Sequence, residues 1–97
     1  MNLAVQLGSL NLKNPVMPAA GTFSVDSSQQ FFNVNDLGAI VAKTVTLHPR
    51  QGNLTPRVAE TYGGMLNSVG LQNAGVDNFL ADEMPKLANL TSPVIIS

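Results

Sequence analysis

The chain has 97 residues, of which 44% are hydrophobic and only 11% are charged, and this length excludes two compact domains. Because an average globular protein has about 25% charged residues, we expect part of the surface to be covered by further protein, and the apolar content excludes a disordered chain. Five Lys and Arg against six Asp and Glu give a net charge of −1, and without a run of either sign neither a nucleic acid nor a membrane surface is expected as a partner.

The N-terminal segment predicts short β-strands. Residues 3–7 and 10–13 are alternating runs separated by Gly8-Ser9, a pattern typical of a β-hairpin. Residues 16–21 are mostly apolar and finish in small side chains, so we expect a buried parallel strand there. Pro18 weakens this prediction because proline offers no N–H to a sheet.

The next segment predicts a helix and a second buried strand. Asp26 followed by Gln29 resembles a helix-capping box without its hydroxyl residue, and apolar side chains follow, so a helix is predicted over residues 26–35. Residues 39–42 are uncharged and lead to Lys43, as expected of a buried strand. Strand, helix and strand in this order predict a right-handed βαβ crossover.

Residues 45–75 are rich in Gly, Pro, Asn and Thr and predict a long loop. This stretch is much longer than the ~12 to 15 residues of most structureless loops. Its apolar residues favour an ordered loop over a disordered one; they are Val58, Tyr62, Met65, Leu66, Val69 and Leu71. We therefore expect the loop to be functional.

The C-terminal part predicts one helix and one strand. Helical spacing relates Val76, Phe79, Leu80, Met84 and Leu87. Pro85 is expected either to kink that helix or to open a new first turn, and residues 93–97 are predicted to form a third buried strand.

The predicted order is hairpin, strand, helix, strand, long loop, helix, strand, which is the start of a repeating β/α fold. A (β/α)8 barrel needs about 250 residues. We therefore expect residues 1–97 to form one partial α/β barrel domain, with the hairpin and the first two and a half β/α units.

Composition also limits location and chemistry. No window approaches the ~18 apolar residues of a membrane helix, and the first residues lack the basic start of a signal peptide, so a cytoplasmic protein is expected. The chain has no cysteine and one histidine, and we therefore predict neither a disulfide nor a metal site. Redox chemistry would need a bound cofactor.

Lys43 is the first candidate for chemistry, because it follows an apolar strand. In β/α barrels the carboxyl ends of the strands form the active site, and a lysine there stabilises developing negative charge. Pattern alone favours the alternative, a strand-end lysine that reaches solvent along its aliphatic stem.

A second candidate is the amide-rich stretch Asn67-Ser68-Val69-Gly70-Leu71-Gln72-Asn73. Gly70 allows close approach of a ligand to the backbone, and N–H groups in such a turn form an anion-sized concavity. A surface loop whose asparagines satisfy their own turns is equally compatible with this pattern. For Arg50, Arg57 and His48 we favour structural roles, the arginines tying down the long loop. Gly-rich phosphate-binding motifs are absent.

A collinear set of motifs relates the chain to one enzyme family. The motifs are Leu12-Lys13-Asn14-Pro15, Pro18-Ala19-Ala20-Gly21, Lys43-Thr44, Thr46-Leu47-His48-Pro49-Arg50, Gly52-Asn53, Thr55-Pro56-Arg57-Val58-Ala59-Glu60-Thr61, Gly64-Met65-Leu66-Asn67-Ser68-Val69-Gly70-Leu71-Gln72-Asn73 and Gly75. Over nearly all of its length the chain resembles the N-terminal third of a class 1 dihydroorotate dehydrogenase. The sequence around His48 and Gln72 is most similar to that of class 1B, whose members use NAD⁺ through a partner subunit that carries FAD and an iron–sulfur cluster.

The resemblance implies an FMN-binding TIM (β/α)8 barrel that oxidises dihydroorotate to orotate in pyrimidine synthesis. It implies that the residues in contact with FMN are Ala20, Gly21, Lys43 and Thr44. It implies that the residues in contact with dihydroorotate or orotate are Lys43, Asn67, Ser68, Val69, Gly70 and Leu71.

The chain departs from the family pattern at two points. The family usually has a serine where this chain has Ala20, so one hydroxyl contact to the flavin would be missing. The class 1 catalytic base is a cysteine on a later loop, and this chain has no cysteine. We therefore expect the base beyond Ser97, no catalytic residue within these residues, and no turnover by the chain alone.

Two other functions stay open. A non-catalytic binding or self-association module derived from the barrel would cover its open sheet edges by forming a homo-oligomer or by binding another protein. A piece of a related flavin barrel, such as dihydropyrimidine dehydrogenase, would share the reasoning for Lys43. The motifs from Pro49 to Asn73 favour dihydroorotate dehydrogenase over this relative.

Overall fold

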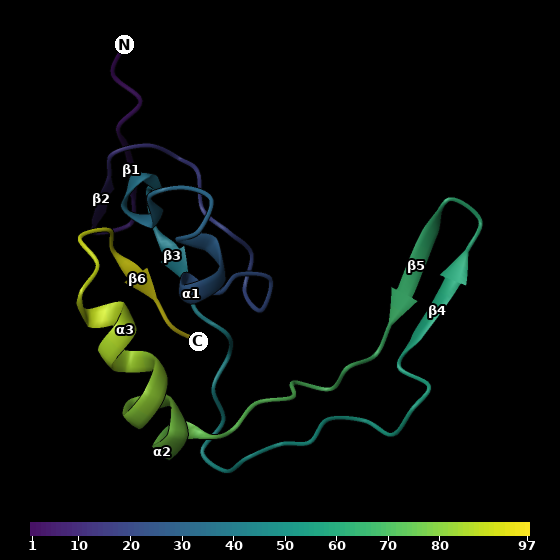
Figure 1. Ribbon diagram of the computed structural model, residues 1–97. Helices are drawn as coiled ribbons and strands as arrows, with labels where there is room; N and C mark the ends of the chain where they lie inside the picture. Colours follow the sequence, from purple (N-terminus) through teal and green to yellow (C-terminus); the bar gives the residue numbers. More distant parts are fainter.

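The computed structural model describes all of residues 1–97, and it is a mixed α/β structure with three two-stranded sheets (Figure 1). This confirms the predicted α/β class. β1 (Val5–Leu7) and β2 (Leu10–Leu12) pair antiparallel on either side of Gly8 and Ser9, where the alternating pattern predicts strands. Leu12 is fully buried whereas the other residues of both strands are exposed, so Leu12 anchors this sheet.

The central sheet is the parallel pair of β3 (Ile40–Val41) and β6 (Val94–Ile95). Hydrogen bonds continue past the strand ends, because Ala42 N donates to Ile95 O at 2.9 Å and Val45 N donates to Ser97 O at 2.8 Å. Both strands lie where sequence predicts buried strands, and the chain between them forms a helix-containing crossover. Lys43 therefore leaves the sheet at the carboxyl end of β3.

The predicted C-terminal helix is present as one continuous stretch of three parts. These are α2 (Val76–Asn78), a π-helical turn η2 (Phe79–Glu83) and α3 (Met84–Ala88). Pro85 lies in the first turn of α3, as expected. Proline has no N–H and its ring crowds the carbonyl four residues earlier, and the wider π turn accommodates both effects.

The predicted strand over residues 16–21 is wrong, and so is the first βαβ crossover. This segment makes one long-range backbone hydrogen bond, from Gly38 N to Val16 O at 2.9 Å. Pro15 and Pro18 have no N–H to donate, and no other strand lies alongside. The segment runs extended and ends in a turn, where Thr22 N and Thr22 Oγ1 both donate to Ala19 O.

The single helix predicted over residues 26–35 is also wrong. Only α1 (Val25–Ser28) is α-helical, and a 3-10 turn, η1 (Val34–Asp36), follows a bend. Asn33 begins the new turn, because its side-chain oxygen accepts a hydrogen bond from Asn35 N at 3.1 Å.

The long loop is ordered, as expected, but it contains a β-hairpin that sequence analysis missed. β4 (Val58–Thr61) and β5 (Gly64–Asn67) pair antiparallel around Tyr62 and Gly63. Figure 1 shows this β4–β5 arm standing apart from the rest of the chain. Bonds from Arg50 N to Asn73 O and from Asn53 N to Val69 O, each 2.9 Å, join the two segments that lead to the arm.

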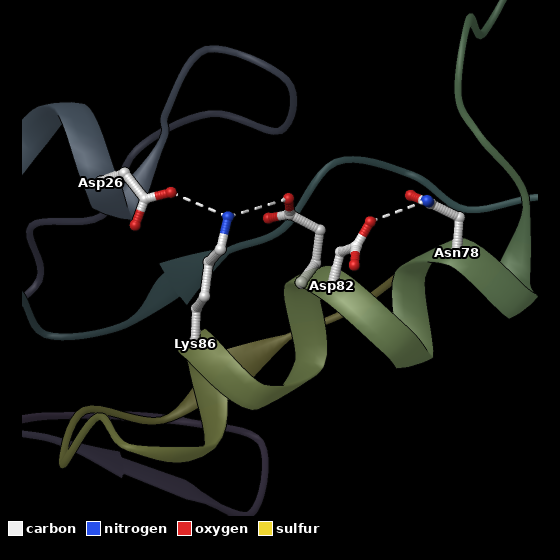
Figure 2. A network of polar contacts seen from close by, with 5 residues as sticks. Asp26, Asn78, Asp82 and Lys86 are labelled. Carbon is white, nitrogen blue, oxygen red and sulfur yellow. Dashed lines mark hydrogen bonds and ion pairs between the residues drawn. The ribbon is translucent and has the colours of Figure 1, made fainter.

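The core lies between the central sheet, α1, η1 and the C-terminal helix. Its buried members are Val25, Val34, Ile40, Ala42, Phe79 and Leu87. At its margin Lys86 Nζ donates to Asp26 Oδ2 at 2.8 Å and lies 3.6 Å from Glu83 Oε1, which links α3 to α1 (Figure 2). The hydrogen bond to Asp26 is the main cause that raises the pKa of Lys86 above its ordinary value, and the charge of Glu83 adds to it.

Much apolar surface is exposed. Only 11 of the 97 residues are buried, and the radius of gyration is 15.6 Å, compared with about 13 Å for a compact domain of this length. Leu47, Leu80 and Ile96 are exposed around one apolar hollow of about 370 Å³ beside β6. This surface agrees with the low charge content, which predicts cover by further protein. None of the helices is long and apolar enough to cross a membrane.

Candidate functional site

Eight of the nine residues that the resemblance places at the site line one hollow of about 630 Å³. They are Ala20, Gly21, Lys43, Asn67, Ser68, Val69, Gly70 and Leu71, and Thr22 completes the lining. Three segments distant in sequence therefore meet here: the turn after residues 16–19, the end of β3, and the end of β5 with the loop that follows. The volume falls in the range of small-molecule sites.

Thr44 does not line this hollow. Its hydroxyl oxygen lies 2.9 Å from Ser97 Oγ, and with Lys43 it lines a separate hollow of about 220 Å³ that includes Asn73 and Glu83. Consecutive side chains of extended backbone point to opposite sides. Lys43 therefore borders both hollows, whereas Thr44 borders only the smaller one.

The side chain of Lys43 lies across Gly21. A Cβ atom on Gly21 would be 3.1 Å from Lys43 Cδ and 3.6 Å from Lys43 Cε. The backbone of Gly21 has a φ of +76°, which glycine adopts more readily than other residues. Glycine at this position therefore gives the lysine stem its place in the hollow.

The ammonium group of Lys43 has no partner in the protein, since both ion pairs of the chain belong to Lys86. Lys43 is exposed and is the only charged residue that lines the hollow. The hollow thus carries one unneutralised positive charge, which favours an anionic ligand.

The far side of the hollow is a row of hydrogen-bond donors. Asn67 ends β5 opposite Val58, and its side-chain amide bonds to no protein group. The N–H groups of Val69, Gly70 and Leu71 likewise donate to no protein acceptor. An anion or a carbonyl-rich molecule would satisfy such donors.

The loop after β5 has an unusual backbone. Gly70 has a φ of +83°, and Leu71, at +56°, is the only non-glycine residue of the chain with a positive φ. A left-handed conformation costs a residue with a side chain about 1 kcal/mol. The neighbouring structure must hold Leu71 in place against this cost.

Arg57 supplies part of that support. Its Nε donates to Asn53 O at 2.7 Å, Nη1 to Gln72 Oε1 at 2.8 Å, and Nη2 to Gln51 O at 2.9 Å. This confirms the prediction that an arginine ties down the loop. Arg50 contributes through its backbone, which pairs with Asn73.

Two asparagines hold the site region by hydrogen bonds: Asn53 has no role in the sequence-based predictions, whereas Asn73 satisfies its own turn, which is the alternative stated for the stretch from Asn67 to Asn73. Asn73 Oδ1 accepts from Gly75 N at 2.9 Å, and its Nδ2 donates to Leu71 O at 2.7 Å. Asn53 Nδ2 donates to Ser68 O and Ser68 Oγ. The side-chain partner of Asn53 lies 15 positions away, so only the Gly52-Asn53 motif drew attention to this residue.

Comparison with known proteins gives a consistent result. The family model for dihydroorotate dehydrogenase matches residues 2–97. The dihydroorotate dehydrogenase B (NAD(+)) catalytic subunit of Listeria monocytogenes serotype 4a (strain HCC23) is 52% identical over 94 residues, which are 96% of this chain and 31% of that protein. The protein of the same name from Geobacillus sp. (strain WCH70) is 53% identical over 94 residues, 96% of this chain and 30% of its own length.

A third relative of the same name, from Thermoanaerobacter sp. (strain X514), is 52% identical over 98 aligned positions, which cover 100% of this chain and 32% of that protein. The chain thus spans about a third of the length of the curated relatives it matches.

Proposed function

Because this chain belongs to the dihydroorotate dehydrogenase family, a family of oxidoreductases, we propose that it supplies the N-terminal part of an FMN-dependent β/α barrel that oxidises dihydroorotate to orotate. One observation carries the proposal: a free ammonium group, a free carboxamide and three free backbone N–H groups border the same hollow. These donors match a small ring that bears carbonyl groups and a carboxylate.

In this proposal the donors divide the substrate between them. The carboxamide of Asn67 can both donate to a ring carbonyl and accept from a ring N–H. The N–H groups of Val69, Gly70 and Leu71 take the carboxylate, which needs several donors when it is removed from water. Lys43 adds a positive charge to balance the carboxylate. Its stem lies against Gly21, which with Ala20 forms the wall of the hollow opposite these donors.

The residues of the opposite wall fit a flavin. Ala20 and Gly21 have little or no side chain, so a flat ring can approach their backbone closely. The flavin, when bound, supplies the acceptor for the hydride of the substrate. Lys43 lies over Gly21 and would hold its positive charge beside both groups, where a preorganised charge stabilises the transition state by about 3 kcal/mol.

The names of the relatives extend the proposal to a partner. They describe a catalytic subunit that works with NAD(+). We therefore include in the proposal a second subunit, with FAD and an iron–sulfur cluster, that passes electrons from the flavin to NAD⁺.

A self-association module is the second candidate. The apolar hollow beside β6, with Leu80 and Ile96 exposed, favours it. A chain that covers this surface with another copy of itself would be oligomeric without the remaining barrel and would not need the donors around Lys43.

The test uses a completed chain, in which these residues are joined to the remaining two thirds of the Listeria relative. We expect the completed chain to bind FMN. In the absence of oxygen, added dihydroorotate should then bleach the flavin absorbance, and this assay needs no second subunit. The unaltered Listeria protein is the control. If the completed chain folds and binds FMN but dihydroorotate leaves the absorbance unchanged, the proposed function is wrong.

A further inference from the structure

We propose that Asn53 is a positioning residue for substrate binding, which acts by holding the loop of Ser68, Val69, Gly70 and Leu71. The inference rests on the proposed function of the hollow that this loop lines. Asn53 itself does not line the hollow, so its effect on a ligand passes through the loop.

The hydrogen bonds of Asn53 fix two successive peptide groups. Its side-chain Nδ2 donates to Ser68 O at 3.1 Å and to Ser68 Oγ at 2.9 Å. Its backbone N donates to Val69 O at 2.9 Å. Both loop carbonyls are therefore turned toward Asn53.

The orientation of the carbonyls determines the orientation of the donors. In a planar trans peptide the N–H points opposite to the C=O of the same peptide group. With the Ser68 and Val69 carbonyls turned toward Asn53, the N–H groups of Val69 and Gly70 point away from it. These are two of the three N–H groups that have no protein acceptor, and they belong to residues that line the hollow.

Steric contact reinforces this arrangement. A Cβ on Gly70 would be 2.7 Å from Asn53 Oδ1 and 2.9 Å from Asn53 N, so only glycine lets the two segments approach so closely. A Cβ on Gly52 would likewise collide with Val69 O. The loop therefore cannot shift closer to Asn53, and the hydrogen bonds of Asn53 oppose movement away from it.

Asn53 is itself braced. Its carbonyl accepts from Arg57 Nε at 2.7 Å, and the same guanidinium donates to Gln72 at the far end of the loop. Asn53 thus connects a rigid support to the peptide groups that would face the substrate.

The experiment compares three variants of the completed chain. Asn53→Leu keeps the approximate size and neutral charge of the side chain but removes its N–H donors, and Asn53→Ala also removes its bulk. Leu54→Ala is the matched control, because Leu54 is the next residue and is 93% exposed. Each variant is measured for FMN content, thermal unfolding, orotate affinity and the kinetics of dihydroorotate oxidation.

We expect Asn53→Leu to weaken orotate binding and raise KM at least about tenfold. Without Asn53 the loop N–H groups lose their alignment, and with it their charge-assisted hydrogen bonds to the substrate carboxylate. FMN content and kcat should change less than about twofold, because the loop holds substrate equally before and during reaction. The preference for orotate over its methyl ester should fall, since the ester lacks the charge that the N–H groups bind. Leu54→Ala should match the parent.

Two results overturn the inference. One is an Asn53→Leu variant that binds orotate as tightly as the parent. The other is a loss of FMN, fold and orotate binding together in both Asn53 variants, which would make Asn53 a general stabilising residue. If the parent completed chain binds FMN but no orotate, the proposed function itself fails, and this inference fails with it.

Discussion

The stem of Lys43 occupies the space beside Gly21 where any other residue would place a side chain: a Cβ there would be 3.1 Å from Lys43 Cδ. The two residues come from segments that share no strand pairing. Their contact brings the carboxyl end of β3 against the turn after residues 16–19. The position of the only charge in the hollow thus depends on the absence of a side chain 22 positions earlier.

Gly21→Ala should displace Lys43 and slow flavin reduction in the completed chain by at least about tenfold, because small misplacement of a group at the reacting centre is costly. Gly8→Ala is a matched control. Gly8 also has a positive φ, of +59°, but a Cβ there meets nothing within 4 Å. Both variants should lose about 1 kcal/mol of stability from backbone strain, so stopped-flow reduction rates separate strain from displacement. Equal rates in the two variants would contradict the importance of the contact.

Ala20→Ser should tighten FMN binding. Ala20 is exposed in the hollow, and the serine usual in the family would add one hydroxyl contact to the flavin, worth about 1 kcal/mol or a few-fold in affinity. FMN titration of the completed chain and of the variant measures the change. An unchanged or weaker affinity would show that the hydroxyl finds no partner at this position.

The isolated 97-residue chain should bind FMN negligibly. Only three short segments line the hollow, and among them one charged residue and a few N–H groups are available to a ligand that also carries a phosphate. Flavin fluorescence is the measurement. Quenching at low micromolar protein would show that these residues suffice for binding and would contradict this expectation.

The ion pair of Lys86 should stabilise the completed chain in a pH-dependent way. Its hydrogen bond to Asp26 raises the pKa of Lys86 in the folded state above the ordinary value. The stabilisation is therefore fully present below the ordinary pKa of lysine and is lost as the pH rises through the raised value. Lys86→Met should lower the thermal midpoint slightly at neutral pH, and the difference from the parent should vanish at strongly alkaline pH.

Lys13→Met is the control for that comparison, because Lys13 takes part in no ion pair. Added salt should shrink the Lys86 effect, since both partners are solvent-exposed. A difference between Lys86→Met and the parent that persists unchanged at alkaline pH would show that packing of the lysine stem, and not its charge, is responsible.

The parallel pair and the helix between its strands were predictable from sequence. Uncharged runs bounded by Gly38 and Lys43, and helical spacing from Val76 to Leu87, are local signals. Residues 16–21 have the same apolar character but form no strand, because a strand needs a partner with matching hydrogen bonds, and Pro18 and the preceding Pro15 remove donors. Composition does not report the presence of such a partner.

The β4–β5 arm was missed for a different reason. All of its strand residues are exposed, so no buried face imposes an alternating pattern. The sequence indicates this hairpin only through the β-forming residues Val58 and Thr61, which precede the turn Tyr62-Gly63. Gly63 has a φ of +71° in that turn. A two-residue turn with glycine between short β-forming runs is the hairpin pattern that applies.

The lining of the hollow followed from the family resemblance, not from periodicity. On pattern alone Lys43 was better explained as a solvent-exposed strand-end lysine. Asn53 illustrates what neither approach supplied. It acts across 15 positions on Ser68, and the direction of a peptide group is visible only once both segments are placed.

The central claim is that the free ammonium of Lys43 serves the chemistry of this hollow, and flavin reduction by dihydroorotate in the Lys43→Ala completed chain tests it most directly. We predict a rate about two orders of magnitude below that of the parent, the effect of losing about 3 kcal/mol of transition-state stabilisation, while Lys13→Ala reduces at the parent rate. An Lys43→Ala variant that retains FMN and is reduced as fast as the parent would contradict the claim.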